Sequence, residues 1–139
     1  KRVDFMWGKY LKYGETGNMR LLRLGKKNSG SWRGMTHERW LIKGLLGRLT
    51  NPLQHFPHKN LTEFLKEINF YTNIRSKELK LKDKKTNFLE IILYPIGKFL
   101  LNYFIKRGFM DGIAGLIFAI TMSFHSFLVR GKLWQQNEK

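Results

Sequence analysis

The chain has 139 residues, with 26 Lys and Arg against 10 Asp and Glu, and its formal charge is +16. This length suits one domain with a core of its own, and the charge favours a polyanionic partner such as nucleic acid, an anionic membrane surface or a phosphorylated substrate. Aromatic residues make up 14% of the chain and hydrophobic residues 42%, which excludes a disordered basic tail. The chain has no cysteine, so disulfides, thiolate metal sites and cysteine redox chemistry are excluded.

The first 50 residues predict short extended segments and loops. Residues 3–24 contain "VDFMW" and "MRLLRL", separated by the turn signal "YGETGN", and this pattern is typical of a hairpin. Glycines and serines in "GKKNSGSWRG", residues 25–34, predict a loop. The following "ERWLIKGLLGRL" fits either a short helix or a pair of strands, because Gly44 and Gly47 each disfavour a helix by about 1 kcal/mol relative to alanine.

The middle of the chain predicts a connector and then a long helix. Pro52 and Pro57 favour an extended backbone. Asn60 is placed to cap a helix, with Glu63 as its partner, and apolar residues follow at helical spacing as far as Tyr71, which predicts a helix from Asn60 to about Leu79. The Lys-rich stretch after this helix predicts a solvated hinge. We therefore divide the chain into residues 1–80, a basic linker at 81–87, and an apolar helical tail at 88–139.

The tail predicts two helical segments near a membrane. "FLEIILYPIGKFLLNYFIKRG" indicates two short helices or one helix kinked at Pro95, with Gly108 as the stop. The next helix is expected to begin with Asp111 as its N-cap and to end at Arg130 and Gly131. Its apolar body of about 17 residues is at the short edge of what spans a bilayer.

Basic residues flank both apolar segments, and they are Lys98, Lys106, Arg107, Arg130 and Lys132. This arrangement favours a helix pair that lies in the interface of an anionic membrane, with Trp134 at headgroup level, over a true span. The alternative is a helical hairpin that packs on the rest of the protein.

The stretch "SWRGMTHERW", residues 31–40, concentrates the side chains best suited to chemistry. The carboxylate of Glu38 can accept a proton from a sugar hydroxyl. Aromatic rings that can stack on sugar faces and guanidinium groups that can hold phosphate surround it, and these belong to Trp32, Trp40, Arg33 and Arg39. The alternative for Glu38 is a surface salt bridge with an arginine. The spacing of the four histidines matches no zinc signature.

Three long segments carry a resemblance to a known family: "MRLLRLGKKNSGSWRGMTHERW", "LTNPLQHFPHKNLTEFLKEINFYT" and "FLLNYFIKRGFMDGIAGLIFAITMSFHSFL". Together they resemble the C-terminal part of family-two glycosyltransferases, especially the group with lipopolysaccharide-core glucosyltransferases. The resemblance covers nearly the whole chain in the right order. The matching residues are Arg20, Leu21, Arg23, His37, Glu38, His55, Phe56, Lys66, Asn69, Tyr71, Phe99, Tyr103, Gly108, Phe109, Asp111, Gly112 and Gly115.

This resemblance implies an α/β chain that forms the C-terminal part of a Rossmann-like GT-A domain, followed by amphipathic and apolar helices. It implies inverting transfer of a sugar from a nucleotide-sugar donor, with a divalent cation, Mg or Mn, in the full-length enzyme. Glu38 then acts as the general base on the acceptor hydroxyl, and His37 orients it or contacts the diphosphate. The resemblance makes four arginines candidates for binding the diphosphate or an acceptor phosphate, and these are Arg20, Arg23, Arg33 and Arg39.

One departure from the family pattern is the absence of an Asp-x-Asp motif, since the only aspartates are Asp4, Asp83 and Asp111. We therefore expect the donor and metal sites to lie in an N-terminal half outside this chain, and the chain alone to be inactive. The expected acceptor is a lipid-linked or lipopolysaccharide-type glycan at the cytoplasmic face of the inner membrane, where the protein is peripheral or monotopic. Two alternatives are a basic membrane-surface protein without catalysis and a nucleic-acid-binding module. The apolar tail and the lack of a recognition motif argue against nucleic acid as the partner.

Overall fold

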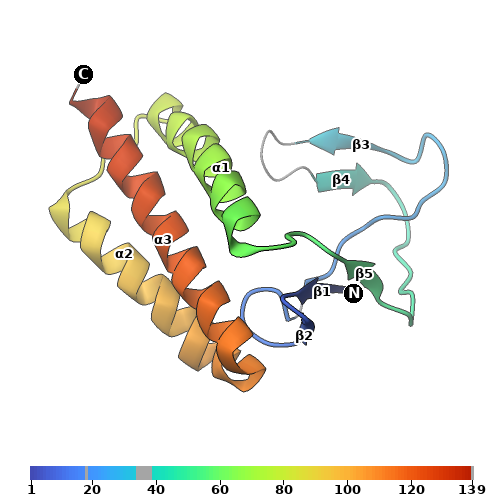
Figure 1. Ribbon diagram of the computed structural model, residues 1–139. Coiled ribbons are helices and arrows are strands. Elements are labelled where there is room, and N and C mark those ends of the chain that lie inside the picture. The colour runs from blue at the N-terminus through green and yellow to red at the C-terminus, as the bar shows by residue number, and fades with distance from the viewer. Residues whose placement is uncertain (18, 34–38, 139) are drawn as a thin grey trace.

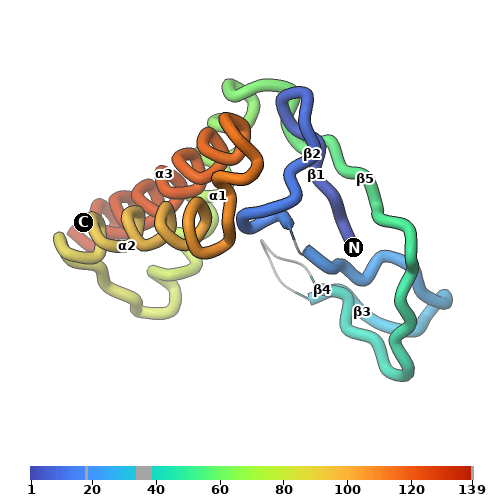
Figure 2. The backbone as a smooth tube through the Cα atoms, turned by 90° about the horizontal axis from the view of Figure 1, so that it is seen from below, coloured from blue at the N-terminus to red at the C-terminus, as the bar shows by residue number. Residues whose placement is uncertain are grey.

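The computed structural model describes residues 1–17, 19–33 and 39–138. Three helices lie side by side, with α3 (Gly112–Asn137) between α1 (Leu61–Leu81) and α2 (Phe88–Leu100), as Figure 1 shows. Short strands gather beside one end of this helical layer, and Figure 2 shows the same separation from below. The chain is therefore a small α/β unit.

The N-terminal strands form a three-stranded sheet in the order β2-β1-β5. β1 (Arg2–Met6) pairs antiparallel with β2 (Lys9–Leu11) and parallel with β5 (Leu53–His55). Trp7 and Gly8 form the turn of the hairpin, with φ of 52° and 78°. This early turn brings Met6 and Leu11 into the core, where they are 1% and 2% exposed.

The predicted hairpin is therefore wrong in its second strand. Residues 19–24, "MRLLRL", have no regular structure. The two-residue turn after Met6 gives β1 a nearer partner, and pairing with that partner buries Leu11.

A second hairpin forms from β3 (Gly30–Arg33) and β4 (Arg39–Ile42). The loop predicted for residues 25–34 is therefore wrong at its C-terminal end. Both alternatives for the segment after it are wrong too, because its described residues form neither a helix nor a pair of strands but the single strand β4. Gly30 allows the close approach, because a Cβ atom there would lie 2.3 Å from the carbonyl oxygen of Leu41. A glycine read as a loop signal is here the residue that lets two strands pair.

The predicted helix after Asn60 is confirmed and continues to Leu81. The Asn60 side chain accepts the backbone N–H of Glu63 at 2.9 Å, and the Glu63 carboxylate accepts the backbone N–H of Lys59 at 3.1 Å. Only part of the apolar pattern is buried: Phe64 and Ile68 enter the core, while the other apolar residues of the pattern stay more exposed. The core cluster contains Met6, Leu11, Phe64, Ile68 and Phe118.

The first apolar segment of the tail is one continuous helix rather than two. Pro95 lies inside α2, which passes directly into a π-helical turn, η1 (Leu101–Ile105). After the helix, Arg107 takes the left-handed conformation that was expected of Gly108 as the helix stop, with φ of 57°. Gly108 is needed for a different reason, because a Cβ atom there would lie 2.6 Å from the carbonyl oxygen of Asn102.

The last helix differs from its prediction at both ends. Asp111 occupies the N-cap position of α3 after a 3-10 turn, η2 (Gly108–Asp111), but its side chain does not cap the helix. At the other end α3 continues past Arg130 and Gly131 to Asn137, so the predicted stop is wrong. Contacts with α1 stabilise this extension, because Lys132 donates to the Thr72 hydroxyl at 2.7 Å.

Asp111 instead joins the helical layer to the sheet. Its carboxylate is 3% exposed and accepts the backbone N–H groups of Lys12 and Tyr13, at 3.0 and 2.9 Å. Gly14 adds a backbone hydrogen bond to the carbonyl of Lys106 at 2.9 Å. These bonds fix the loop after β2 against the turn between α2 and α3.

Two helical segments of the described chain, Phe88–Ile105 and Gly108–Asn137, are long and apolar enough to cross a membrane by length and composition. The division of the chain at residues 81–87 stays a prediction. In the structure these residues include the connection between α1 and α2.

Candidate functional site

The two residues expected to carry the chemistry, His37 and Glu38, lie outside the described residues, in the segment 34–38. This segment joins β3 to β4. The structure therefore places the residues on either side of it.

The β3–β4 hairpin brings four of the predicted site residues together. Trp32 and Trp40 are directly opposite in the strand register and stack at 6.0 Å between ring centroids. Arg33 and Arg39 form the next pair, at the end of the hairpin where residues 34–38 connect the strands. The predicted grouping of these four side chains is thus present, although on a strand pair that the sequence did not predict.

The two remaining arginines come from the irregular segment before β3. The Arg23 guanidinium lies 5.6 Å from the centroid of the Trp32 ring, close enough for a cation–π interaction. Arg20 is exposed three residues earlier. Arg23 therefore joins the tryptophan pair, and no contact places Arg20 there among the described residues.

The hairpin offers an aromatic surface with positive charge around it. Trp32 is 50% exposed, and Arg33 and Arg39 are also exposed. A half-exposed indole suits apolar contact with a sugar ring, and exposed guanidinium groups suit a phosphate. The described residues of this hairpin thus combine aromatic rings and guanidinium groups, and they include no carboxylate.

A second polar group, centred on Asp4, was not anticipated. Asp4 is 2% exposed, and its carboxylate contacts Arg2 at 2.7 Å and the Nδ1 of His55 at 3.1 Å. The parallel register of β1 and β5 places His55 opposite Asp4. No local sequence signal announces this pairing between segments 51 residues apart.

The described residues do not fit a resident metal ion. They contain no group of three or more His, Cys, Asp or Glu side chains that could hold one. Asp4 is engaged by Arg2 and His55, and the Asp111 carboxylate by two backbone N–H groups. Both carboxylates are therefore occupied by groups of the protein itself.

His58, three residues after His55, is expected to make the free energy of unfolding depend on pH. Its ring stacks on Phe64 at 4.1 Å, and burial lowers its pKa below the usual 6.5 although Glu67 opposes the shift. The unfolded chain then binds the proton first, so the free energy of unfolding is highest above pH 6.5 and decreases as the pH falls through the folded pKa.

His58→Phe should keep the ring stack and remove this contribution. The measurement is the urea denaturation midpoint of the wild type and of the variant at several pH values from about 8 to about 5, a range that brackets the titration of histidine. Equal pH slopes for the two proteins would contradict the assignment.

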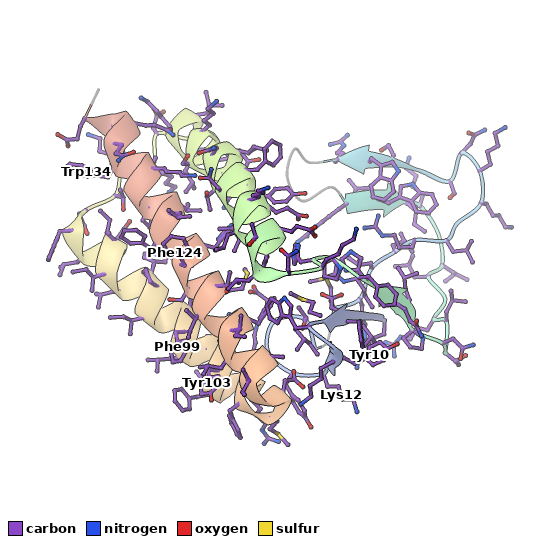
Figure 3. All side chains as sticks on the ribbon, viewed as in Figure 1. Tyr10, Lys12, Phe99, Tyr103, Phe124 and Trp134 are labelled. Atoms are coloured by element: carbon purple, nitrogen blue, oxygen red, sulfur yellow. The ribbon has the colours of Figure 1, made fainter. Side chains whose placement is uncertain are left out.

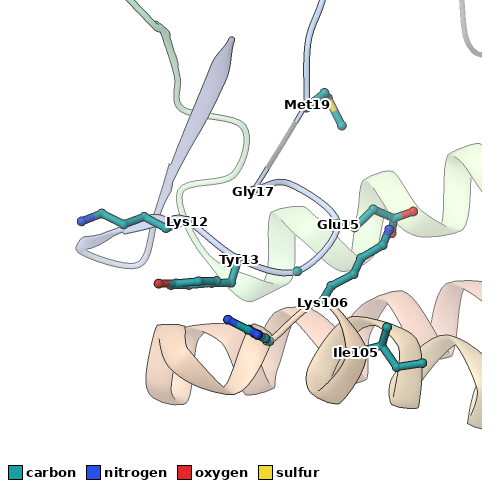
Figure 4. Close-up of a pocket in the computed structure, with 9 residues that line it drawn as sticks. Lys12, Tyr13, Glu15, Gly17, Met19, Ile105 and Lys106 are labelled. Carbon is teal, nitrogen blue, oxygen red and sulfur yellow. The ribbon is translucent and has the colours of Figure 1, made fainter.

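A cleft of about 510 Å³ opens between the loop after β2 and the turn after η1. Figure 4 shows Lys12 and Tyr13 on one side of it and Glu15 with Lys106 on the other. Glu15 is paired with Lys98 at 2.7 Å. Among the described residues, Lys12, Lys106 and Arg107 have no acidic partner, so the cleft is positively charged.

Comparison with known proteins shows what the chain is similar to. The curated relatives of this chain are glycosyltransferases, which confirms the resemblance inferred from the sequence. One is the lipopolysaccharide core biosynthesis glycosyltransferase LpsC of Rhizobium meliloti, 28% identical over 124 residues that cover 88% of this chain and 46% of LpsC. Another is an uncharacterized glycosyltransferase of Rickettsia conorii, 27% identical over 96 residues that cover 69% of this chain and 34% of the relative.

The chain thus spans less than half the length of these relatives, and the match lies in their C-terminal portion. No family model and no solved structure matches.

Proposed function

We propose that this chain forms the acceptor-side, C-terminal part of an inverting glycosyltransferase with a GT-A fold. The substrates are a nucleotide-sugar donor and a lipid-linked or lipopolysaccharide-type glycan acceptor, at the cytoplasmic face of the inner membrane. The similarity to the C-terminal portion of LpsC over 88% of the chain carries this proposal. That relative is a lipopolysaccharide core biosynthesis glycosyltransferase, which supports a cell-envelope acceptor.

Glu38 supplies the general base in this proposal. Its carboxylate takes the proton of the acceptor hydroxyl while the hydroxyl oxygen attacks the anomeric carbon. The bond from that carbon to the diphosphate breaks, and the nucleoside diphosphate leaves with the bonding electrons. The configuration inverts because the hydroxyl attacks the face of the carbon opposite the leaving group. The segment that contains Glu38 joins two strands that carry Trp32, Trp40, Arg33 and Arg39, and this neighbourhood supports the assignment.

The flanking residues bind and orient substrate in this scheme. The Trp32 and Trp40 pair stacks on a sugar ring, and Arg23, Arg33 and Arg39 hold the diphosphate or an acceptor phosphate. His37 orients Glu38 or contacts the diphosphate, and Arg20 contributes to phosphate binding from the neighbouring segment. We assign a divalent cation, Mg or Mn, to the rest of the enzyme.

Sugar transfer by a longer protein that contains this chain tests the proposal. The assay follows label from a nucleotide-sugar donor into lipid-extractable glycan on inner-membrane vesicles. We expect labelled product from the longer protein and none from the 139-residue chain alone. A longer protein that transfers no sugar from any common nucleotide-sugar would contradict the function.

A second candidate is a membrane-surface protein that binds without catalysis. The observation that favours it is the apolar outer side of α2, which has no buried residue along its 13 positions. It predicts vesicle binding by the chain and no sugar transfer by the longer protein.

A further inference from the structure

The helix α2 and its continuation η1 are amphipathic with the polar side turned inward. Over Phe88–Ile105 the strongly polar residues are Glu90, Lys98 and Asn102. Glu90 contacts Arg130 of α3 at 3.6 Å, and Lys98 contacts Glu15 at 2.7 Å. Asn102 is 1% exposed. A helix on the surface of a soluble protein places such residues outward.

The outward side of the same helix is an apolar stripe. Its residues follow each other at helical spacing and are between 45% and 63% exposed, and they are Leu89, Leu93, Ile96, Leu100 and Phe104. Ile105 and Ile113, at the turn between α2 and α3, are 73% and 78% exposed. A continuous apolar surface of this kind indicates a partner that is itself apolar.

The packing of α1 disfavours an orientation in which α2 and α3 cross a bilayer together. α1 lies along α3 from near one end, where Phe64 stacks on Phe118 at 5.9 Å, to the other, where Gln136 donates to Ser76 at 2.9 Å. The outer side of α1 carries charged residues such as Lys66 and Lys77. A span would place these charges in hydrocarbon, at a cost of roughly 3 kcal/mol each.

The charges that are free for a membrane lie at the ends of this surface. Of the five basic residues that flank the apolar segments, three are used inside the fold: Lys98 with Glu15, Arg130 with Glu90, and Lys132 with Asn69 and Thr72. The other two, Lys106 and Arg107, are exposed at the turn, beside Lys12 in the cleft. Lys82, Lys84 and Lys85 lie just before the other end of α2.

Aromatic side chains mark the same two ends. Figure 3 shows Phe99 and Tyr103 toward the turn and Trp134 near the far end of α3. Trp134 is 46% exposed. Tyrosine and tryptophan favour the headgroup region of a bilayer, where one side of the ring is apolar and the other is hydrated.

We propose that the outer side of α2 and η1 lies flat in the headgroup and upper acyl region of an anionic bilayer, with Lys106 and Arg107 on lipid phosphates. Apolar surface, cationic ends and the polar flank of α1 all fit this one occupant. The proposal rests on the membrane location given under the proposed function, and it names the surface and orientation that achieve it.

Vesicle binding by the 139-residue chain tests the orientation. The probe is extruded vesicles of phosphatidylcholine with about 30% phosphatidylglycerol, an anionic content that gives a substantial surface potential, and the readout is co-sedimentation. We expect binding to these vesicles, weaker binding to pure phosphatidylcholine, and release on dilution. A chain that stays bound after dilution would overturn the flat orientation.

Paired variants distinguish binding through the proposed surface from non-specific binding. Lys106→Gln with Arg107→Gln should weaken binding about 30-fold, while Lys26→Gln with Lys27→Gln removes equal charge far from α2 and should leave it nearly unchanged. Leu93→Ser with Ile105→Ser should weaken binding roughly tenfold or more. Its matched control is Leu45→Ser with Leu49→Ser, at positions 103% and 70% exposed.

Equal losses in a variant pair and its control would overturn the proposed surface, as would absence of binding to anionic vesicles. Circular dichroism of each variant verifies that it is folded. Because binding is read without sugar transfer, failure of the orientation and failure of the catalytic proposal are separate results.

Discussion

Asp111→Asn is expected to lower the free energy of unfolding by about 3 kcal/mol, because a buried carboxylate with charge-assisted hydrogen bonds is replaced by an amide. The carboxylate is 3% exposed and accepts two backbone N–H groups, those of Lys12 and Tyr13. An asparagine keeps one acceptor oxygen and turns an NH₂ group toward an N–H donor. Urea denaturation followed by circular dichroism measures the loss.

Asp83→Asn is the matched control for this prediction. Asp83 is exposed in the turn after α1 with φ of 52°, a conformation that asparagine adopts readily. The free energy of unfolding of the Asp83→Asn variant should stay within about 0.5 kcal/mol of the wild-type value. Equal effects of the two substitutions would show that the joint between the sheet and the helices contributes nothing specific.

The role of Asp111 also illustrates where sequence reasoning stops. Its position before an apolar run predicted an N-cap, and the backbone indeed places it there. The side chain has a stronger use, because Lys12 and Tyr13 present two N–H groups about a hundred residues away in the chain. A local pattern gives the start of a helix and cannot show which distant donors compete for its first side chain.

Elements with strong local signals were predicted well. The cap at Asn60 and the helical spacing after it gave α1, because capping and amphipathic spacing act within one or two turns. The end of α3 was wrong for the opposite reason. A glycine weakens a helix by only about 1 kcal/mol relative to alanine. The side-chain hydrogen bonds from Lys132 and Gln136 to α1 outweigh this cost and favour the longer helix.

The strands were predicted less well, because strand pairing depends on distant partners. The parallel pairing of β1 with β5 brings Asp4 and His55 together across 51 residues. "MRLLRL" has an acceptable strand pattern, but its backbone bond to β1, from the Arg2 N–H to the Met19 carbonyl at 2.9 Å, starts no strand ladder, so the segment stays irregular. The grouping of Trp32, Arg33, Arg39 and Trp40 was predicted better, since they are close in sequence and a hairpin of any register keeps them near each other. Their role as a site stays a prediction.

Glu38→Gln in the longer protein should lower kcat for sugar transfer by about 10² to 10⁴, the usual contribution of a general base. Glutamine keeps the size and one hydrogen-bonding oxygen of the side chain, and it cannot take the acceptor proton at neutral pH. Donor binding should persist, because the arginines and tryptophans of the hairpin are unchanged. Steady-state rates with varied donor and acceptor, read together with donor binding by calorimetry, measure both effects.

Glu138→Gln, an identical change at an exposed position after α3, is the control and should leave kcat unchanged. A general base also gives a rate that falls as the carboxylate is protonated, so the wild type should lose activity at low pH and the Glu38 variant should lose this dependence. If the Glu38 variant turns over at a near-normal rate, the proton goes to another group. The hairpin of Trp32 and Trp40 would then remain a substrate-binding surface without the base.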